Sequence, residues 1–195
     1  TGDIRLTNGQ ALTITSIDAG SVSDGTVRVD NTGGGTLTQS GLIINATSVI
    51  LLGDALSLAG DIIASGLVDL TSTGDFTLSN TITAGDITLT STLGNLIVGN
   101  LDSVGTIDLN AATALKTITQ LAATSIIGDG TLDTNSGAAT TISNTGNIVS
   151  VFTAASGTGA IALTNNTTAD LSITGITSGS TVTVSSTGDV TQTTG

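Results

Sequence analysis

The sequence predicts an all-β chain wound into a parallel β-solenoid, and three observations lead to this prediction. The composition favours strands and turns, short phrases led by glycine recur along the chain, and aliphatic positions return at a nearly constant interval. Among the 195 residues there are 40 Thr and 26 Gly, whereas Pro, Cys, Met, Trp, Tyr, His and Glu are absent. Thr, Val and Ile suit a pleated surface, and Gly, Asn and Asp suit tight turns, so helices are not expected.

Short phrases that begin with glycine and then place apolar residues two apart recur along the chain. A glycine followed by such a pair predicts a turn and then a short strand with one buried side. The phrases are GDIRL (2–6), GTVRV (25–29), GDFTL (74–78), GDITL (85–89), GNLIV (94–98), GTIDL (105–109), GNIVS (146–150), GAIAL (159–163) and GDVTQ (188–192).

Aliphatic residues fall into three tracks, each of which returns at the same interval. The first track runs through Val49, Val68, Ile87, Ile107 and Ile126, and the second through Leu56, Phe76, Leu96 and Leu115. The third runs through Leu42, Ile62, Ile82, Leu101, Leu121 and Ile142. A repeat of about 20 residues is the signature of a solenoid, in which each strand pairs with its equivalent one coil away.

Three tracks predict three short strands per coil of about 20 residues, with the aliphatic side chains stacked inside. The whole chain, residues 1–195, is then a single solenoid segment of roughly ten coils and about 45 to 50 Å. A β-sandwich or barrel of short antiparallel strands is the alternative, because closely spaced turn signals also suit it. A sandwich gives no reason for so constant a period.

Two parts of the chain depart from this period. Before residue 45 the return is longer, from Val27 to Val49 and from Ile14 to Leu37, which predicts extra residues in loops. Between residues 111 and 157 we expect the phase to slip. Beyond the slip, one ladder is expected through Leu132, Phe152, Leu171 and Val190, and another through Ile142, Ile161 and Val182.

The charge and the missing residue types exclude several classes of partner and chemistry. Fifteen Asp against Arg5, Arg28 and Lys116 give a net charge of −12, so neither nucleic acid nor insertion into a membrane is expected. A chain without Cys forms no disulfide and no zinc thiolate site. The longest apolar run, residues 49–52, is far short of a membrane span. No signal peptide is recognised and the chain starts at Thr1, so we interpret it as a processed chain or part of a longer one.

The aspartates that follow glycine are the most plentiful candidates for a site. They are Asp3, Asp54, Asp61, Asp75, Asp86, Asp129 and Asp189. Carboxylates in turns can bind calcium or act as acids and bases, but they more often bond nearby backbone, and we expect the structural role here. The cluster from Gly128 to Asp133 loosely resembles glycine- and aspartate-rich calcium repeats, yet it occurs once. We therefore predict no metal site.

Catalysis is not expected either, so we predict no catalytic and no cofactor-binding residue. A polysaccharide-acting enzyme on such a fold needs paired carboxylates in a groove, with basic or aromatic residues beside them. The three basic residues are far apart in the sequence, and Trp, Tyr, His and Cys are absent. The turns at residues 144–147 and 165–166 are explained by the left-handed geometry that Asn tolerates, and Gly33–Gly35 by a flexible corner. The glycosylation patterns at 45–47 and 166–168 are expected by chance in a chain so rich in Asn and Thr.

The phrases GDFTLSNTITAGDITL (74–89) and GDITLTSTLGNLIVGNLDSVGTIDLN (85–110) resemble the repeat regions of filamentous haemagglutinin-like bacterial exoproteins. The resemblance covers most of the chain, most clearly residues 48–125, and rests on the style of the repeat. It implies a right-handed β-helix that forms a rigid stalk, secreted through an outer-membrane partner pore and carrying an adhesive or toxic tip. No secretion domain or tip is recognised in this sequence.

The sequence thus leads us to expect a structural stalk or fibre segment of a secreted or cell-surface bacterial adhesin, associated with biofilm, without catalysis or cofactor. Copies that stack end to end in filaments, or further coils of a longer chain, are expected at the ends, because no cap is evident there. A glycan- or protein-binding module on one face and the stalk of a contact-dependent toxin delivery protein remain alternatives. A polysaccharide-acting enzyme is the fourth.

Overall fold

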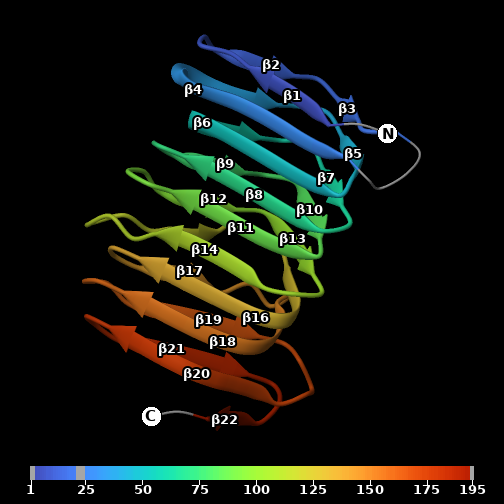
Figure 1. Ribbon diagram of the computed structural model, residues 1–195. Helices are drawn as coiled ribbons and strands as arrows, with labels where there is room; N and C mark the ends of the chain where they lie inside the picture. Colours follow the sequence, from blue (N-terminus) through green and yellow to red (C-terminus); the bar gives the residue numbers. More distant parts are fainter. Residues whose placement is uncertain (1–2, 21–24, 194–195) are drawn as a thin grey trace.

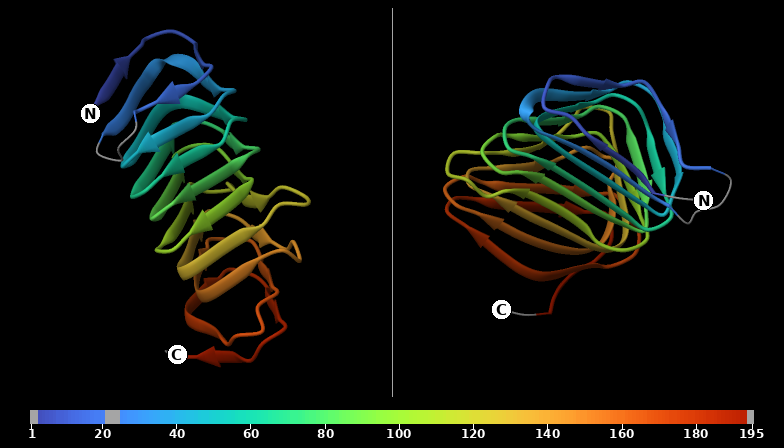
Figure 2. Two further views of the ribbon diagram at one scale, coloured as in Figure 1. Left: turned by 90° about the vertical axis from the view of Figure 1, so that its right-hand side faces the viewer. Right: turned by 45° about the horizontal axis from the view of Figure 1, so that its top comes forward.

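A computed structural model of the chain describes residues 3–20 and 25–193 as a stack of coils built only from strands (Figure 1). All pairings between strands are parallel, and each strand bonds its equivalents in the coils before and after it, so the predicted right-handed parallel β-solenoid is confirmed. The chain completes about nine turns, against the roughly ten that the period suggested. The views in Figure 2 show the coils as rounded triangles that enclose one continuous interior.

Each coil has three faces, which we name A, B and C in chain order. Face A is formed by β1 (Ile4–Thr7), the first halves of β4 (Thr26–Gln39) and β6 (Ser48–Leu58), β8 (Leu67–Ser72), β11 (Asp86–Ser91), β14 (Ile107–Ala111), the second halves of β16 (Ile126–Ser136) and β18 (Ile148–Ser156), and β20 (Leu171–Ser178). Face B is formed by β2 (Leu12–Ile14), the second halves of β4 and β6, β9 (Phe76–Leu78), β12 (Leu96–Val98), β15 (Ile118–Gln120), β17 (Thr140–Ile142), β19 (Ile161–Asn165) and β21 (Val182–Ser186). Face C is formed by β3 (Ile17–Asp18), β5 (Ile43–Ala46), β7 (Ile62–Ala64), β10 (Thr81–Ala84), β13 (Asn100–Ser103) and the first residues of β16 and β18. The last strand, β22 (Val190–Gln192), pairs with the first residues of β20 and so lies at the start of face A.

The core consists of ladders of apolar side chains that run through the stack. On face A, Val27, Val49, Val68, Ile87 and Ile107 are paired in register, and all are fully buried. The two phenylalanines, at 76 and 152, lie in this core with no exposed surface. Because each strand alternates inward apolar and outward polar residues, the alternation of the sequence fills the interior and leaves hydroxyls and carboxylates outside.

The predicted tracks are correct in the regular middle of the chain and wrong where the chain inserts residues. Ile107 pairs with Leu132 rather than Ile126, and Ile126 instead continues face C from Leu101. Leu96 pairs with Ile118, whereas Leu115 is exposed in a left-handed turn. The cause is that this coil is longer than the one before it in two places, between Ile107 and Ile118 on the way from face A to face B and between Ile118 and Ile126 on the way to face C.

Other members of the tracks are displaced within their coils. Ile43 rather than Leu42 lies in the third ladder, and Leu121 is only partly buried in a loop. Ile142 belongs to face B, where it pairs with Leu163 and not Ile161.

Outside the regular middle of the chain, some expected pairs are wrong and others are confirmed. Leu12, not Ile14, pairs with Leu37, and Phe152 pairs with Ile173, not Leu171. The expected pairs Val27 with Val49, Leu132 with Phe152, Leu171 with Val190 and Ile161 with Val182 are present. The coils from Leu12 to Leu37 and from Phe152 to Ile173 contain more residues than the expected return. Extra residues in β4, β16 and β20 shift the register further along each strand without changing the hydrophobic pattern.

Candidate functional site

Four of the aspartates that follow glycine hold neighbouring coils together. Asp3, Asp61, Asp75 and Asp86 each accept a hydrogen bond from a backbone N–H in the next coil, at 2.7 to 3.0 Å. The expected structural role is therefore supported, but the bonded backbone is one coil away in the chain. Asn95 and Asn100 use their side-chain oxygens in the same way on Thr117 and Ser125.

Asp54 makes the corresponding bond backwards, to the glycine run of the preceding coil. Its two carboxylate oxygens accept the N–H groups of Gly33 at 2.9 Å and Gly35 at 3.2 Å. These bonds stabilise the charged form and lower the pKa of Asp54 below its ordinary value. Both glycines have positive φ, so the predicted corner is a defined turn between the two halves of β4.

The cluster from Gly128 to Asp133 spreads its two carboxylates along one strand. Asp129 is exposed near the start of the β16 bulge, and Asp133 lies further along the same strand. Within residues 3–20 and 25–193, no three His, Cys, Asp or Glu side chains are grouped so as to hold a metal ion. The described residues form no pocket, and none of them belongs to a helix that could span a membrane. Asp189, the last of the predicted carboxylates, is exposed just before β22, and its backbone carbonyl accepts the N–H of Leu171.

The asparagines at 147 and 165 are buried, which the sequence reasoning missed. The side chain of Asn147 exchanges two hydrogen bonds with Gln120, at 2.7 and 3.0 Å, and accepts the N–H of Ile126. Asn165 bonds both the N–H and the carbonyl of Val149. Neither has the left-handed φ that was expected; that conformation is adopted by Asn45 among the described asparagines. These amides satisfy buried backbone groups and, for Asn147, the buried side chain of Gln120, so their role is structural.

Face A also carries two pairs of like charges whose members are far apart in the sequence, so the sequence did not reveal them. Arg5 lies directly beside Arg28 in the adjacent strand, and Asp108 lies directly beside Asp133. Burial raises the pKa of both aspartates, and for Asp108 the charge of Asp133 raises it further. The predicted pairing of Ile107 with Ile126 did not bring Asp108 next to Asp133. The two aspartates become neighbours only because Ile107 pairs with Leu132, one longer coil further along the chain.

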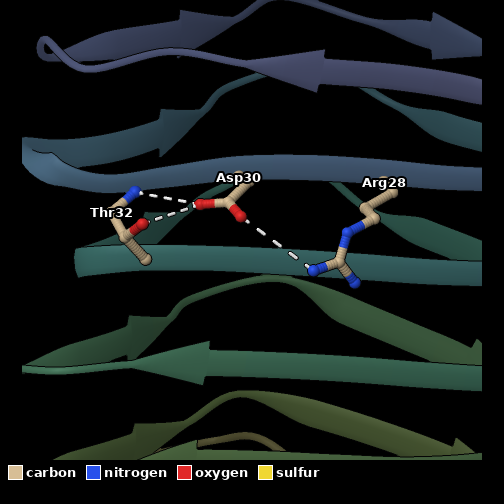
Figure 3. Close-up of polar contacts among 3 residues, drawn as sticks. All are labelled: Arg28, Asp30 and Thr32. Atoms are coloured by element: carbon tan, nitrogen blue, oxygen red, sulfur yellow. Dashed lines mark hydrogen bonds and ion pairs between the residues drawn. The ribbon is translucent and has the colours of Figure 1, made fainter.

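One ion pair occurs among the described residues, and it lies beside the basic pair. Arg28 approaches Asp30 at 4.0 Å, while the other oxygen of Asp30 accepts bonds from the hydroxyl and the N–H of Thr32, at 2.8 and 3.3 Å (Figure 3). The Thr32 bonds, more than the arginines, lower the pKa of Asp30. At 4.0 Å the contact is a weak surface ion pair that leaves most N–H groups of Arg28 free for another acceptor.

Comparisons with known proteins identify no relative of this chain. No family model matches it, and no curated protein and no solved structure is similar to it at a significant level.

Proposed function

We propose that this chain is a rigid, non-catalytic stalk or fibre segment of a secreted or cell-surface bacterial adhesin. The observation that carries the proposal is the continuous interior: the first ladder of face A is fully buried and aliphatic or aromatic from Val27 in the second coil to Phe152 in the eighth. Every coil adds parallel strands on three sides of this core. Bending such a rod stretches hydrogen bonds on one side and compresses packed side chains on the other, and both changes cost free energy.

Secretion and an adhesive context are supported by the resemblance of the repeat to haemagglutinin-like exoproteins. A physical argument agrees with export through an outer-membrane pore. No disulfide can lock the chain before it crosses, and coils whose contacts are with their neighbours can fold one after another as they emerge.

The first and last described coils suit addition of further coils, either from a longer chain or from copies stacked end to end. Leu6, Val182 and Val190 continue inward ladders but are 40%, 44% and 49% exposed, whereas their paired residues one coil inside are fully buried. A coil placed against either edge would bury these side chains and pair the open strand edges.

The stiffness of the rod is tested by distances between spin labels, since the chain has no native cysteine. Thr13→Cys and Thr183→Cys lie on outward positions of face B in the first and ninth coils, eight steps or about 38 Å apart along the axis. We expect one narrow distance distribution near that value at low concentration. The pair Thr38→Cys and Thr141→Cys, five coils apart on the same face, is the matched control at a shorter distance. A broad distribution that widens with the number of coils would contradict the rigid stalk.

The biological role is tested in the producing cell. Deleting this segment in frame should shorten the surface fibre by about 43 Å per copy, measured by cryo-electron microscopy. A segment that stays inside the cell, or a fibre of unchanged length, would refute the proposal.

A second candidate, a glycan-binding module, is favoured by one observation. The outward row of face B is made of Thr13, Thr38, Ser57, Thr77, Ile97, Thr119, Thr141, Ala162 and Thr183, and the face B strands carry no charged residue. Hydroxyls in a regular row can bond neutral sugars. Saturable binding on a glycan array that is lost in Thr119→Asp would support this candidate.

A further inference from the structure

One row of outward side chains on face A begins with two arginines, and all its other charged residues are aspartates. From the first coil to the eighth the row consists of Arg5, Arg28, Ile50, Asp69, Thr88, Asp108, Asp133 and Thr153, each directly paired with the next. We call it the charged row. Its two arginines are adjacent, and so are its last two aspartates. Like charges directly opposite on neighbouring strands destabilise a sheet, so each pair is unfavourable in an isolated rod.

Nothing within the described chain neutralises the acidic pair. Asp108 and Asp133 are each partly buried on the face. The neighbouring strand β11 contributes Thr88 and, at its first position, Asp86; β18 carries no charged residue at all. Asp129, on the same strand as Asp133, is the remaining charged residue of β14 and β16. All charged groups around the pair are therefore acidic, and its missing partner is a cation.

The basic pair lacks a matching acid in the same way. Arg28 has only the 4.0 Å contact with Asp30, and Arg5 is exposed with no ion pair in the described part of the chain. Two guanidinium groups one coil apart, about 4.8 Å, match the spacing of two carboxylates one coil apart.

We propose that two copies of this chain pair face A to face A with their rods antiparallel, so that Arg5 and Arg28 of each copy meet Asp133 and Asp108 of the other. A two-fold axis along the strand direction at the fourth coil produces this arrangement. It places the first coil opposite the seventh and the second opposite the sixth, and it keeps each row opposite itself. Both arginines lie opposite an aspartate in the same register, because the two arginines are one coil apart and the two aspartates are also one coil apart. By symmetry each of these arginine–aspartate contacts occurs twice.

The rest of face A agrees with this register. Near the axis lie the outward aliphatic side chains Ile50, Leu52 and Leu67, of which Leu67 is 37% exposed and would meet its own copy. In the next row, Asp30 in the second coil would face Asn110 in the sixth, where a carboxylate can accept from an amide. The centre of the contact is therefore mixed, with these aliphatic side chains beside Asp69 and Thr71, and the complementary charges lie toward its two ends.

The size of the contact indicates a weak dimer. Seven overlapping coils are about 34 Å long, and the strands of face A are about 20 Å wide, so about 1,300 Å² of surface is buried in total. This lies at the lower end for specific complexes. One contact opposes pairing, since Asp69 would face Asp69 of the second copy on the axis. The inference does not depend on the stalk role, because a rod of any function can pair by this face.

Charge reversal tests the proposal on the full chain by sedimentation equilibrium. We expect a concentration-dependent dimer for the native sequence, at least tenfold weaker dimerisation for Arg28→Asp or Asp108→Arg alone, and recovery to within about threefold in the double variant. Asp69→Asn should tighten the dimer. Circular dichroism melting shows that each variant is folded. A native chain that stays monomeric at millimolar concentration, or a double variant as weak as the single ones, overturns the proposal.

The geometry is tested by a single introduced cysteine. Thr71 lies on face A in the fourth coil, beside the axis, whereas Thr77 lies on face B of the same coil. A short bis-maleimide should crosslink copies of Thr71→Cys and not of Thr77→Cys. Crosslinking through Thr77 alone, or scattering that shows longer rods of unchanged cross-section, would place the contact elsewhere and refute pairing through face A.

Discussion

Replacing Thr134 by valine should stabilise the rod, because this hydroxyl is buried without a hydrogen-bond partner. Thr134 occupies an inward position of face A between Leu109 and Ala154 and has no exposed surface. Burying an unbonded hydroxyl costs about 1–3 kcal/mol, and valine has the same shape with a methyl group in its place. We therefore expect Thr134→Val to raise the free energy of unfolding by about 1–2 kcal/mol.

The matched control is Thr140→Val, which should have the opposite sign. Thr140 is equally buried, but its hydroxyl lies 3.0 Å from that of Ser136. Losing this bond should cost about 1 kcal/mol. Urea unfolding gives both free energies, and hydrogen exchange of the β16 amides reports the local effect if a rod of repeats does not unfold in one step. A Thr134→Val variant that is less stable than the native chain would refute the reasoning, since it would show that the hydroxyl has a partner.

Two further predictions concern coil stacking and pH. Gly94→Ala should destabilise the chain by about 3 kcal/mol or more, because the new Cβ would lie 2.2 Å from the carbonyl carbon of Gly74 in the coil before it. Gly175→Ala, whose Cβ meets nothing within 4 Å, should change the free energy of unfolding far less in the same urea experiment, and equal losses would contradict the explanation. The raised pKa of Asp108 and of Asp133 means that the folded chain holds these protons more tightly than the unfolded chain. Their contribution to stability is full below the unfolded pKa of about 3.9 and falls as the pH rises through the folded values. Asp133→Asn should therefore lose less stability than the native chain between about pH 4 and pH 7, and parallel curves would count against this.

The regular part of the fold was predictable because it obeys local rules. Between Val49 and Leu109 a glycine turn, two inward aliphatic residues and a constant return determine which residues face inward. The structural role of the aspartates after glycine followed from their turn positions. Their actual partners, such as the N–H of Thr106 for Asp86, required the stacking of coils.

The rest could not be predicted because insertions move the register without a sequence signal. Ile126 and Leu115 fit the repeat period as well as the true partners do, and the loops between faces decide against them. The buried role of Asn147 was hidden for the same reason. Its bond to Gln120 joins two different coils, and nothing local to either residue indicates it.

Composition and alternation by themselves determined that the chain is all-β, that it winds into a parallel solenoid and that its interior is aliphatic, because these properties depend on contacts with the adjacent strand and repeat in every coil. The tertiary structure decided which charges share a face. A whole coil of sequence separates Arg5 from Arg28 and Asp108 from Asp133, yet each pair is adjacent on one face and both lie in one row. The length of every intervening loop sets that alignment, so the charge pattern exists only in the folded rod.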